Sequence, residues 1–158
     1  MRSTTKANRP TTPDPIYGSV KVTKLVNYVM RDGKKTVAEK QVYAALNLLS
    51  EQLKKGPLEA FDEVIEAITP QMEVRSRRVG GAAYQVPMPV RPARGFSLAI
   101  RWMVQEARKR SSSQYHTFAE KLVAEMLDSL SNQGGAMQRK ATSHRMAEAN
   151  KAFAHFRW

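Results

Sequence analysis

The sequence contains no cysteine, and this absence excludes disulfide bonds, thiolate metal sites and a cysteine nucleophile. Histidine is scarce, and His116, His144 and His155 lie at none of the spacings typical of metal ligands. No apolar run approaches the ~18 residues of a membrane-spanning helix, and the N-terminus lacks the apolar core of a secretory signal. We therefore expect a soluble, intracellular protein with no metal ion or other cofactor and no membrane partner.

Acidic residues are also under-represented, and their distribution is uneven. The 158 residues include 26 lysines and arginines against 14 acids, a net charge of +12, while the 42% of apolar residues argues against full disorder. Residues 1–35 hold 8 basic and 2 acidic groups, residues 36–71 hold 3 and 6, and residues 72–110 hold 9 and 2. Two basic blocks around an acidic one favour a one-sided surface for a polyanion.

The N-terminal segment, residues 1–15, is rich in threonine and proline and has almost no apolar side chains. Arg2, Lys6 and Arg9 make this segment a flexible basic arm. Its composition is compatible with two behaviours: an arm that becomes ordered on a polyanion, or a terminus that simply frays.

Apolar spacing in the remainder, residues 16–158, predicts a single, mainly α-helical domain. Six helices are expected, over about 19–32, 37–54, 57–69, 92–110, 118–130 and 136–150. Ser19 is placed to cap the first helix, and capping boxes are expected at 36–39 (TVAE) and 117–120 (TFAE). The predicted fold is thus a bundle of about six helices with a disordered basic arm and one protruding β-hairpin.

The hairpin is predicted at residues 72–90, where the sequence changes to an alternating pattern around Gly80 and Gly81. A three-residue loop at 79–81 collects apolar side chains on one face and Arg75, Arg77 and Gln85 on the other. The resulting pairs are Met72 with Met88, Val74 with Val86, and Ser76 with Tyr84. Two prolines in the second strand restrict it to an edge, so a two-stranded ribbon is expected.

A row of arginines follows the hairpin directly. Arg94, Arg101 and Arg108 recur every seven residues on one side of the predicted helix at 92–110, and further cations extend the row at both ends. Trp102 lies near this side, where it either packs beneath a neighbouring element or stacks on a base. The basic turn at 32–35 (DGKK) lacks the glycine and Ser/Thr spacing of a phosphate-binding loop.

These features favour nucleic-acid binding over catalysis. The glutamates lie on scaffold helices without a nearby histidine or serine, and the glycine pair at a hairpin tip is no dinucleotide fingerprint. An arm, a basic helix face and a ribbon together reach several distant phosphates, which suits folded RNA better than straight duplex DNA. The alternatives are a transcript-binding repressor or nucleoid protein and, more remotely, an enzyme with an unrecognised site.

Three sequence strings, two of them long, carry a family resemblance. Residues 77–92 (RRVGGAAYQVPMPVRP), the turn at 32–35 and residues 144–158 (HRMAEANKAFAHFRW), with PDP at 13–15, are similar to bacterial small-subunit ribosomal protein seven. The resemblance extends over nearly the whole chain. It implies a non-enzymatic constituent of the small ribosomal subunit in the cytoplasm, a helical bundle with a projecting ribbon.

The resemblance also implies partners. Members of this family bind the 3′ major domain of 16S ribosomal RNA early and nucleate assembly of the subunit head. They lie at the subunit interface near the exit-site tRNA, beside small-subunit ribosomal proteins nine and eleven, and some repress their own message.

Carried onto this sequence, the resemblance assigns residues to three partners. Ribosomal RNA contacts are expected from Arg2, Lys6, Arg9, Lys34, Lys35, Arg75, Arg77, Arg78, Arg91, Arg94, Arg101, Arg108, Lys109 and Arg110. Residues near the exit-site tRNA are Val79, Gly80, Gly81, Tyr84 and Arg145. A C-terminal tail for RNA and a neighbouring protein contains Lys151, Phe153, Phe156 and Trp158, and its alternative is internal packing onto the bundle.

Overall fold

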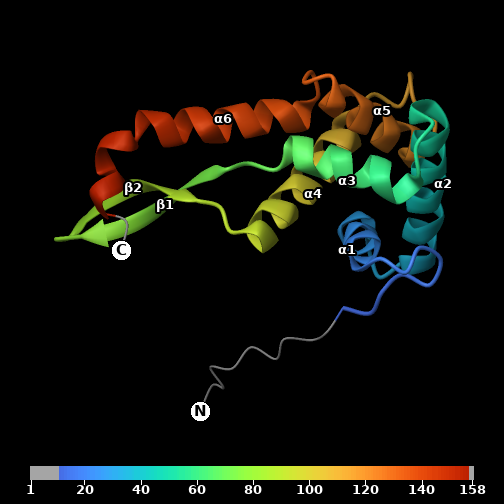
Figure 1. Ribbon diagram of the computed structural model, residues 1–158, viewed down its shortest axis with the longest axis horizontal. Helices are drawn as coiled ribbons and strands as arrows, with labels where there is room; N and C mark the ends of the chain where they lie inside the picture. The colour runs from blue at the N-terminus through green and yellow to red at the C-terminus, as the bar shows by residue number, and fades with distance from the viewer. Residues whose placement is uncertain (1–10, 157–158) are drawn as a thin grey trace, which may run out of the picture.

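The computed structural model describes residues 11–156, which are mainly helical (Figure 1). In chain order the elements are α1 (Val20–Val29), α2 (Lys35–Leu53), α3 (Pro57–Ile68), β1 (Met72–Val79), β2 (Ala82–Pro89), α4 (Pro92–Lys109), α5 (Phe118–Leu130), α6 (Gly135–Ala149) and the 3-10 helix η1 (Lys151–Phe156). The predicted class, a bundle of about six helices with a two-stranded hairpin, is confirmed. Arg2, Lys6 and Arg9 of the predicted arm, and Trp158 of the tail, lie outside the described residues.

Helices α1 to α5 enclose the core because each presents apolar residues at helical spacing to its neighbours. The fully buried side chains include Leu25, Leu46, Phe61, Ile100 and Leu122, one from each of these helices. Helix α6 differs, since only Ala136 and Ala147 near its two ends are buried. It runs from the bundle to the β-ribbon, and η1 turns back beside the strands (Figure 1).

Two predicted helix starts are confirmed at atomic detail. The Ser19 side chain accepts a hydrogen bond from the Lys21 amide at the start of α1. At the start of α5, both hydrogen bonds of the capping box between Thr117 and Glu120 are present. Capping side chains satisfy amides that have no partner within the helix, which fixes where each helix begins.

The capping box predicted at 36–39 is wrong. Helix α2 begins at Lys35, and its N-cap, Lys34, makes no side-chain capping bond. The preceding turn explains the shift, because Asp32 and Gly33 both adopt positive φ, at 52° and 73°. This tight turn brings the chain into the helix two residues earlier than the sequence predicted, so Thr36 lies within the first helical turn.

The predicted hairpin register is also wrong. A two-residue turn joins the strands, with Val79 opposite Ala82. Gly80 and Gly81 have φ of 56° and 90°, and such a turn requires positive φ at both central positions. The observed pairs include Arg77 with Tyr84, Arg75 with Val86, Val74 with Pro87, and Glu73 with Met88.

The register prediction failed because it assumed that polar and apolar residues must separate onto opposite faces. Glu73 is only 7% exposed, although it shares one face of the ribbon with the fully buried Val86 and the exposed Arg75. Arg75 and Arg94 neutralise this carboxylate, so the buried face can hold a charged side chain. A strict alternation of polar and apolar residues would exclude a charge from this face. The prediction of a two-stranded ribbon, however, is confirmed.

Part of the segment assigned to the arm packs on the bundle. Asp14 is 4% exposed, and its carboxylate accepts hydrogen bonds from the Tyr17 amide at 3.0 Å and the Tyr43 hydroxyl at 2.7 Å. Burial and the Asp14 carboxylate together raise the pKa of Tyr43 above its ordinary value. The hydroxyl of Thr23 also donates to the Thr12 carbonyl at 2.9 Å. Residues 11–15 are thus anchored to α1 and α2.

A buried ion pair connects three helices. Glu125 of α5 is 2% exposed, and its Oε2 accepts from Nη2 of Arg110 at 2.7 Å and from Nε at 3.0 Å. Its Oε1 accepts from the Ala136 amide at 2.9 Å, at the start of α6. Arg110 also contacts Asp128. The C-terminal end of α4 and the N-terminal end of α6 are therefore held to the same side of α5.

Candidate nucleic-acid interface

The arginine row on α4 connects the ribbon to the opposite end of the bundle. Arg94 donates from Nε to Glu73 at 3.2 Å at the ribbon root, whereas Arg108 donates from Nη2 to the Val29 carbonyl at 2.9 Å at the end of α1. Arg101 lies between them, is exposed, and has no ion pair among residues 11–156. At 1.5 Å per residue the row spans about 21 Å, which is long enough to face several phosphates.

The turn between α1 and α2 supplies further cations. Arg31 and Lys34 are exposed, and neither forms an ion pair with an acid in the described part of the chain. Lys35 differs, because its Nζ lies 3.4 Å from Oε1 of Glu39 one helical turn away. The turn thus presents two charges that its own chain does not neutralise.

Glu73 fixes the root of the ribbon. Its carboxylate accepts from Nε of Arg75 at 2.7 Å and from Nε of Arg94 at 3.2 Å, which joins β1 to the first turn of α4. Burial alone would raise the pKa of Glu73, but the hydrogen bonds and charges of the two arginines outweigh it and hold the pKa below its ordinary value. The carboxylate is therefore ionised at neutral pH and holds the root of the ribbon to α4.

Glu73→Gln is expected to lower the free energy of unfolding at neutral pH by about 1–3 kcal/mol, because two charge-assisted hydrogen bonds are weakened. Since folding lowers the pKa of Glu73 from 4.5, this contribution is complete above the unfolded-state pKa and is lost as the pH falls through the folded-state value. Urea unfolding of both proteins between pH 7 and pH 3 checks this. A stability difference that persists unchanged at the acidic end would contradict the assignment.

The C-terminal tail packs on the ribbon. The ring centroid of Tyr84 lies 5.3 Å from that of Phe153 and 5.0 Å from that of Phe156, both in η1. Helix α6 adds two polar contacts, since the Gln71 amide donates to Nε2 of His144 at 3.0 Å and the Ser143 hydroxyl donates to a β1 carbonyl at 3.0 Å. Within the described residues the tail aromatics thus pack internally, although on the ribbon and not on the helical bundle.

Replacing Phe153 and Phe156 together by alanine is expected to accelerate amide hydrogen exchange in β1 and β2 about 5- to 150-fold. Two aromatic contacts are lost, each contributing about 0.5–1.5 kcal/mol, and an isolated hairpin is marginally stable. Amides of α1 to α5 serve as internal reference and should exchange at the wild-type rate. Lys151→Ala, an exposed change in η1, is the matched control. If β1 and β2 of the double variant exchange their amide hydrogens at the wild-type rate, the tail does not stabilise the ribbon.

The residues assigned to RNA divide into two groups. Those without an ion pair or a side-chain hydrogen bond among residues 11–156 are Lys34, Arg77, Arg78, Arg91 and Arg101, together with Arg145 of the tRNA set. Those that bind their own chain are Lys35, Arg75, Arg94, Arg108, Lys109 and Arg110. Arg110 is the most engaged, because its side chain is 17% exposed between two carboxylates. It supports the bundle, and its charge is balanced inside the fold.

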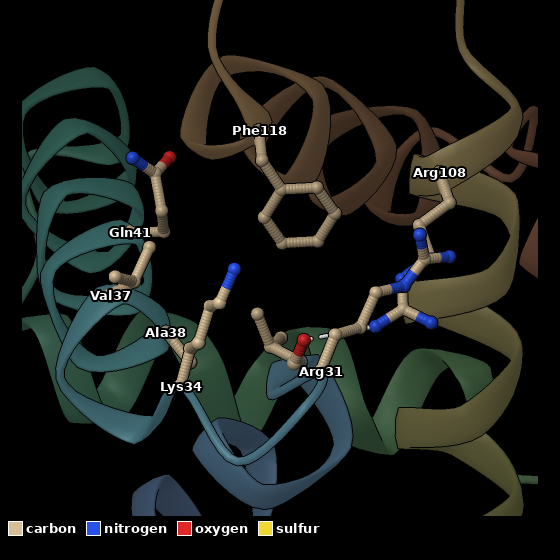
Figure 2. Close-up of a pocket in the computed structure, with 8 residues that line it drawn as sticks. Arg31, Lys34, Val37, Ala38, Gln41, Arg108 and Phe118 are labelled. Atoms are coloured by element: carbon tan, nitrogen blue, oxygen red, sulfur yellow. Dashed lines mark hydrogen bonds between the residues drawn. The ribbon is translucent and has the colours of Figure 1, made fainter.

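A hollow beside the α1–α2 turn was not foreseen from the sequence (Figure 2). This Phe118 hollow has a volume of about 240 Å³ and is lined by Val29, Arg31, Lys34, Val37, Ala38, Gln41, Arg108 and Phe118. Phe118 comes from the first turn of α5 and points into the hollow between the basic side chains. No local pattern could have revealed it, because its walls come from segments far apart in the chain.

Within residues 11–156 no group of three or more acidic or histidine side chains could hold a metal ion, and no helix is long and apolar enough to cross a membrane.

Trp102 packs against the core, which is the first of the two alternatives predicted for it. The candidate interface thus consists of the ribbon, the α4 row and the α1–α2 turn with its hollow.

Known proteins match the chain over nearly its full length. The profile of the family "Ribosomal protein S7p/S5e" matches residues 1–151. "Small ribosomal subunit protein uS7" of Caldanaerobacter subterraneus subsp. tengcongensis is 55% identical over 146 residues, 92% of each chain. Proteins of the same name from Sulfurihydrogenibium sp. and Teredinibacter turnerae are 56% and 51% identical, over 92% and 96% of each chain.

Together with the helical bundle and its basic hairpin, these similarities define the class of the protein: a structural component of the small ribosomal subunit, and not an enzyme. More particularly, the chain belongs to the uS7 family of ribosomal proteins. The resemblance drawn from its three sequence strings is therefore confirmed.

Proposed function

We propose that the protein binds the 3′ major domain of 16S ribosomal RNA directly and nucleates assembly of the subunit head. One observation carries this proposal: the α4 row runs from the ribbon root to the α1–α2 turn, and the exposed Lys34, Arg78, Arg91 and Arg101 have no acidic partner among residues 11–156. Cations along a path of about 20 Å are neutralised best by a ligand with several phosphates at different positions. A folded RNA junction offers such phosphates, whereas a straight duplex offers them along one line.

The second part of the proposal concerns location. We place the protein on the cytoplasmic ribosome, with the ribbon tip near the exit-site tRNA and with small-subunit proteins nine and eleven as neighbours. The tip supports this, because Gly80 and Gly81 are exposed, adopt positive φ and have no atom near the position of an added Cβ. Backbone without side chains permits close approach of a ligand. Val79, Tyr84 and Arg145 complete the proposed tRNA-proximal set, and Lys151 remains exposed toward a protein neighbour.

Filter binding to a head-domain fragment of 16S ribosomal RNA, with total RNA as competitor, tests the first part. We expect the fragment to be bound much more tightly than the competitor, with an affinity that falls steeply as salt rises. Equal affinity for both RNAs would contradict a dedicated site. Sucrose-gradient sedimentation is the companion experiment, and a protein that migrates away from small-subunit particles would favour a free transcript-binding role.

A further inference from the structure

We propose that Asp32 of the free protein is a modification site, which converts to isoaspartate and is then methylated by an isoaspartyl methyltransferase that uses S-adenosylmethionine. The site lies in the α1–α2 turn, which Figure 2 shows as the loop between the labelled Arg31 and Lys34. The inference concerns the chemistry of this turn alone and does not depend on the proposed RNA-binding function.

The residue that follows Asp32 is the first reason for the proposal. Isoaspartate forms when the amide nitrogen of the next residue attacks the carboxyl carbon of an aspartate side chain. The four aspartates of the sequence precede, in chain order, proline, glycine, glutamate and serine, and Asp32 is the one before glycine. A glycine leaves its amide nitrogen sterically open because it has no Cβ, whereas proline has no amide hydrogen to lose.

Both reacting groups of this site are free in the fold. Asp32 is exposed, and its carboxylate forms no ion pair or hydrogen bond with the residues between 11 and 156. The Gly33 amide donates no hydrogen bond in the same part of the chain. No atom lies within 4 Å of the position of an added Cβ at Gly33, so the surroundings do not obstruct ring closure.

The other aspartates are protected by their partners. The Asp14 carboxylate accepts a hydrogen bond from the Tyr43 hydroxyl, and it precedes a proline. Asp62 lies within α3 and pairs with Lys21 at 2.8 Å, and Asp128 lies within α5 and contacts Arg110. Inside a helix the backbone is held by hydrogen bonds between residues four apart, which opposes the rotation that ring closure requires.

The conformation of the turn gives a second reason. Asp32 has a φ of 52°, in the left-handed region that costs energy for a residue other than glycine. The Lys34 amide closes the turn by donating to the Arg31 carbonyl at 2.9 Å. Asp32 can rotate by breaking this bond without unwinding α1 or α2. The product has one more methylene group in its main chain, so the turn gains a rotatable bond that relieves the strain.

The reaction needs only water and protons. The Gly33 nitrogen bonds to Cγ of Asp32, and one carboxyl oxygen leaves as water with the amide proton and a proton from solvent, which forms a succinimide ring. Water then adds to the main-chain carbonyl carbon of residue 32 and breaks its bond to the Gly33 nitrogen. The nitrogen remains joined to Cγ, the carboxylate is now on Cα, and the borrowed proton returns to solvent. The methyltransferase moves a methyl group from the sulfonium of S-adenosylmethionine to this carboxylate and releases S-adenosylhomocysteine.

The test follows methylation of the full chain during incubation at neutral pH without RNA. Samples are treated with purified isoaspartyl methyltransferase and radiolabelled S-adenosylmethionine, and electron-transfer fragmentation of proteolytic peptides locates the isoaspartate. We expect the label to increase with incubation time and the isoaspartate to lie at residue 32. Asp32→Glu keeps the charge but requires a larger ring, so its label should stay at the level of fresh protein. Asp32→Asn should be labelled faster than the wild type, because ammonia leaves more readily than hydroxide.

Asp62→Glu is the matched control, since it makes the same change at an exposed aspartate inside a helix and should be labelled as the wild type is. Equal labelling of Asp32→Glu and the wild type, isoaspartate at a different aspartate, or no increase of label in the wild type would overturn the proposal. Locating the isoaspartate in the wild-type chain requires no substitution, so this result holds even if a variant disturbs α2. Because RNA is absent from every sample, failure of the proposed RNA-binding function would leave these outcomes unchanged.

Discussion

Glu125→Ala is expected to lower the free energy of unfolding by about 3–5 kcal/mol, the largest loss from any single substitution considered for this chain. The variant leaves the guanidinium of Arg110, which is 17% exposed, without its main buried partner. It also leaves the Ala136 amide without the oxygen that lies 2.9 Å away. Both defects occur at the junction of α4, α5 and α6, so we expect them to lower the free energy of unfolding of the whole bundle.

Urea denaturation monitored by circular dichroism measures this effect. The control is Glu66→Ala, because Glu66 is exposed on α3 and has no ion pair among residues 11–156. A surface change of this kind should alter stability by no more than about 0.5 kcal/mol. A similarly small loss for Glu125→Ala would mean that the pair does not hold the three helices together.

The double variant Arg91→Ala, Arg101→Ala is expected to lose two phosphate contacts. Both side chains are exposed and have no acidic partner among residues 11–156, so their charges are available to RNA. The log-salt slope for binding the 16S head-domain fragment should fall in magnitude by about 1.4–1.8. Between about 50 and about 200 mM salt, the affinity deficit of the variant should then shrink about 7- to 12-fold.

A second double variant with the same change in net charge is the control. Lys21→Ala and Lys55→Ala remove cations that pair with Asp62 and Glu63 on α3, at 2.8 Å and 2.6 Å. Because both lysines are balanced by carboxylates of α3, the slope should remain at the wild-type value. Equal slopes for the two double variants would show that affinity depends on net charge alone and not on the α4 row.

Local patterns were sufficient to predict most of the secondary structure. The apolar spacing that identified the helices is the same spacing that buries Leu46 and Ile100, so pattern and packing agree. Ser19 and Thr117 cap their helices as predicted because capping depends on residues within one turn. The hairpin was located correctly for a similar reason, since two adjacent glycines favour a turn.

The failures concern charges whose partners are distant in sequence. The hairpin register was misassigned because apolar side chains were expected on one face and polar ones on the other. In the structure Glu73 is buried, and its partner Arg94 lies on the next helix. Arg110 was predicted to extend the basic row, whereas in the structure Glu125 of α5 binds its guanidinium. A periodicity argument places a side chain on a helix face but does not reveal what faces it.

The candidate interface was only partly predictable for the same reason. The α4 row was found because Arg94, Arg101 and Arg108 share one helix and one period. The Phe118 hollow was missed because Arg31 and Lys34 come from the first half of the chain, whereas Phe118 comes from the second half. In the sequence, Phe118 is simply the second residue of a capping box, and only the fold brings it beside Arg31.

The contact between η1 and the ribbon has a consequence for the order in which the protein matures during synthesis. A nascent chain that has reached residue 130 contains the five helices of the core and both strands, but neither α6 nor η1. Tyr84 can contact its aromatic partners only after Phe153 and Phe156 have been synthesised. The bundle can therefore begin to fold before α6 and η1 are made, whereas the ribbon acquires its fixed orientation only after η1 has been synthesised.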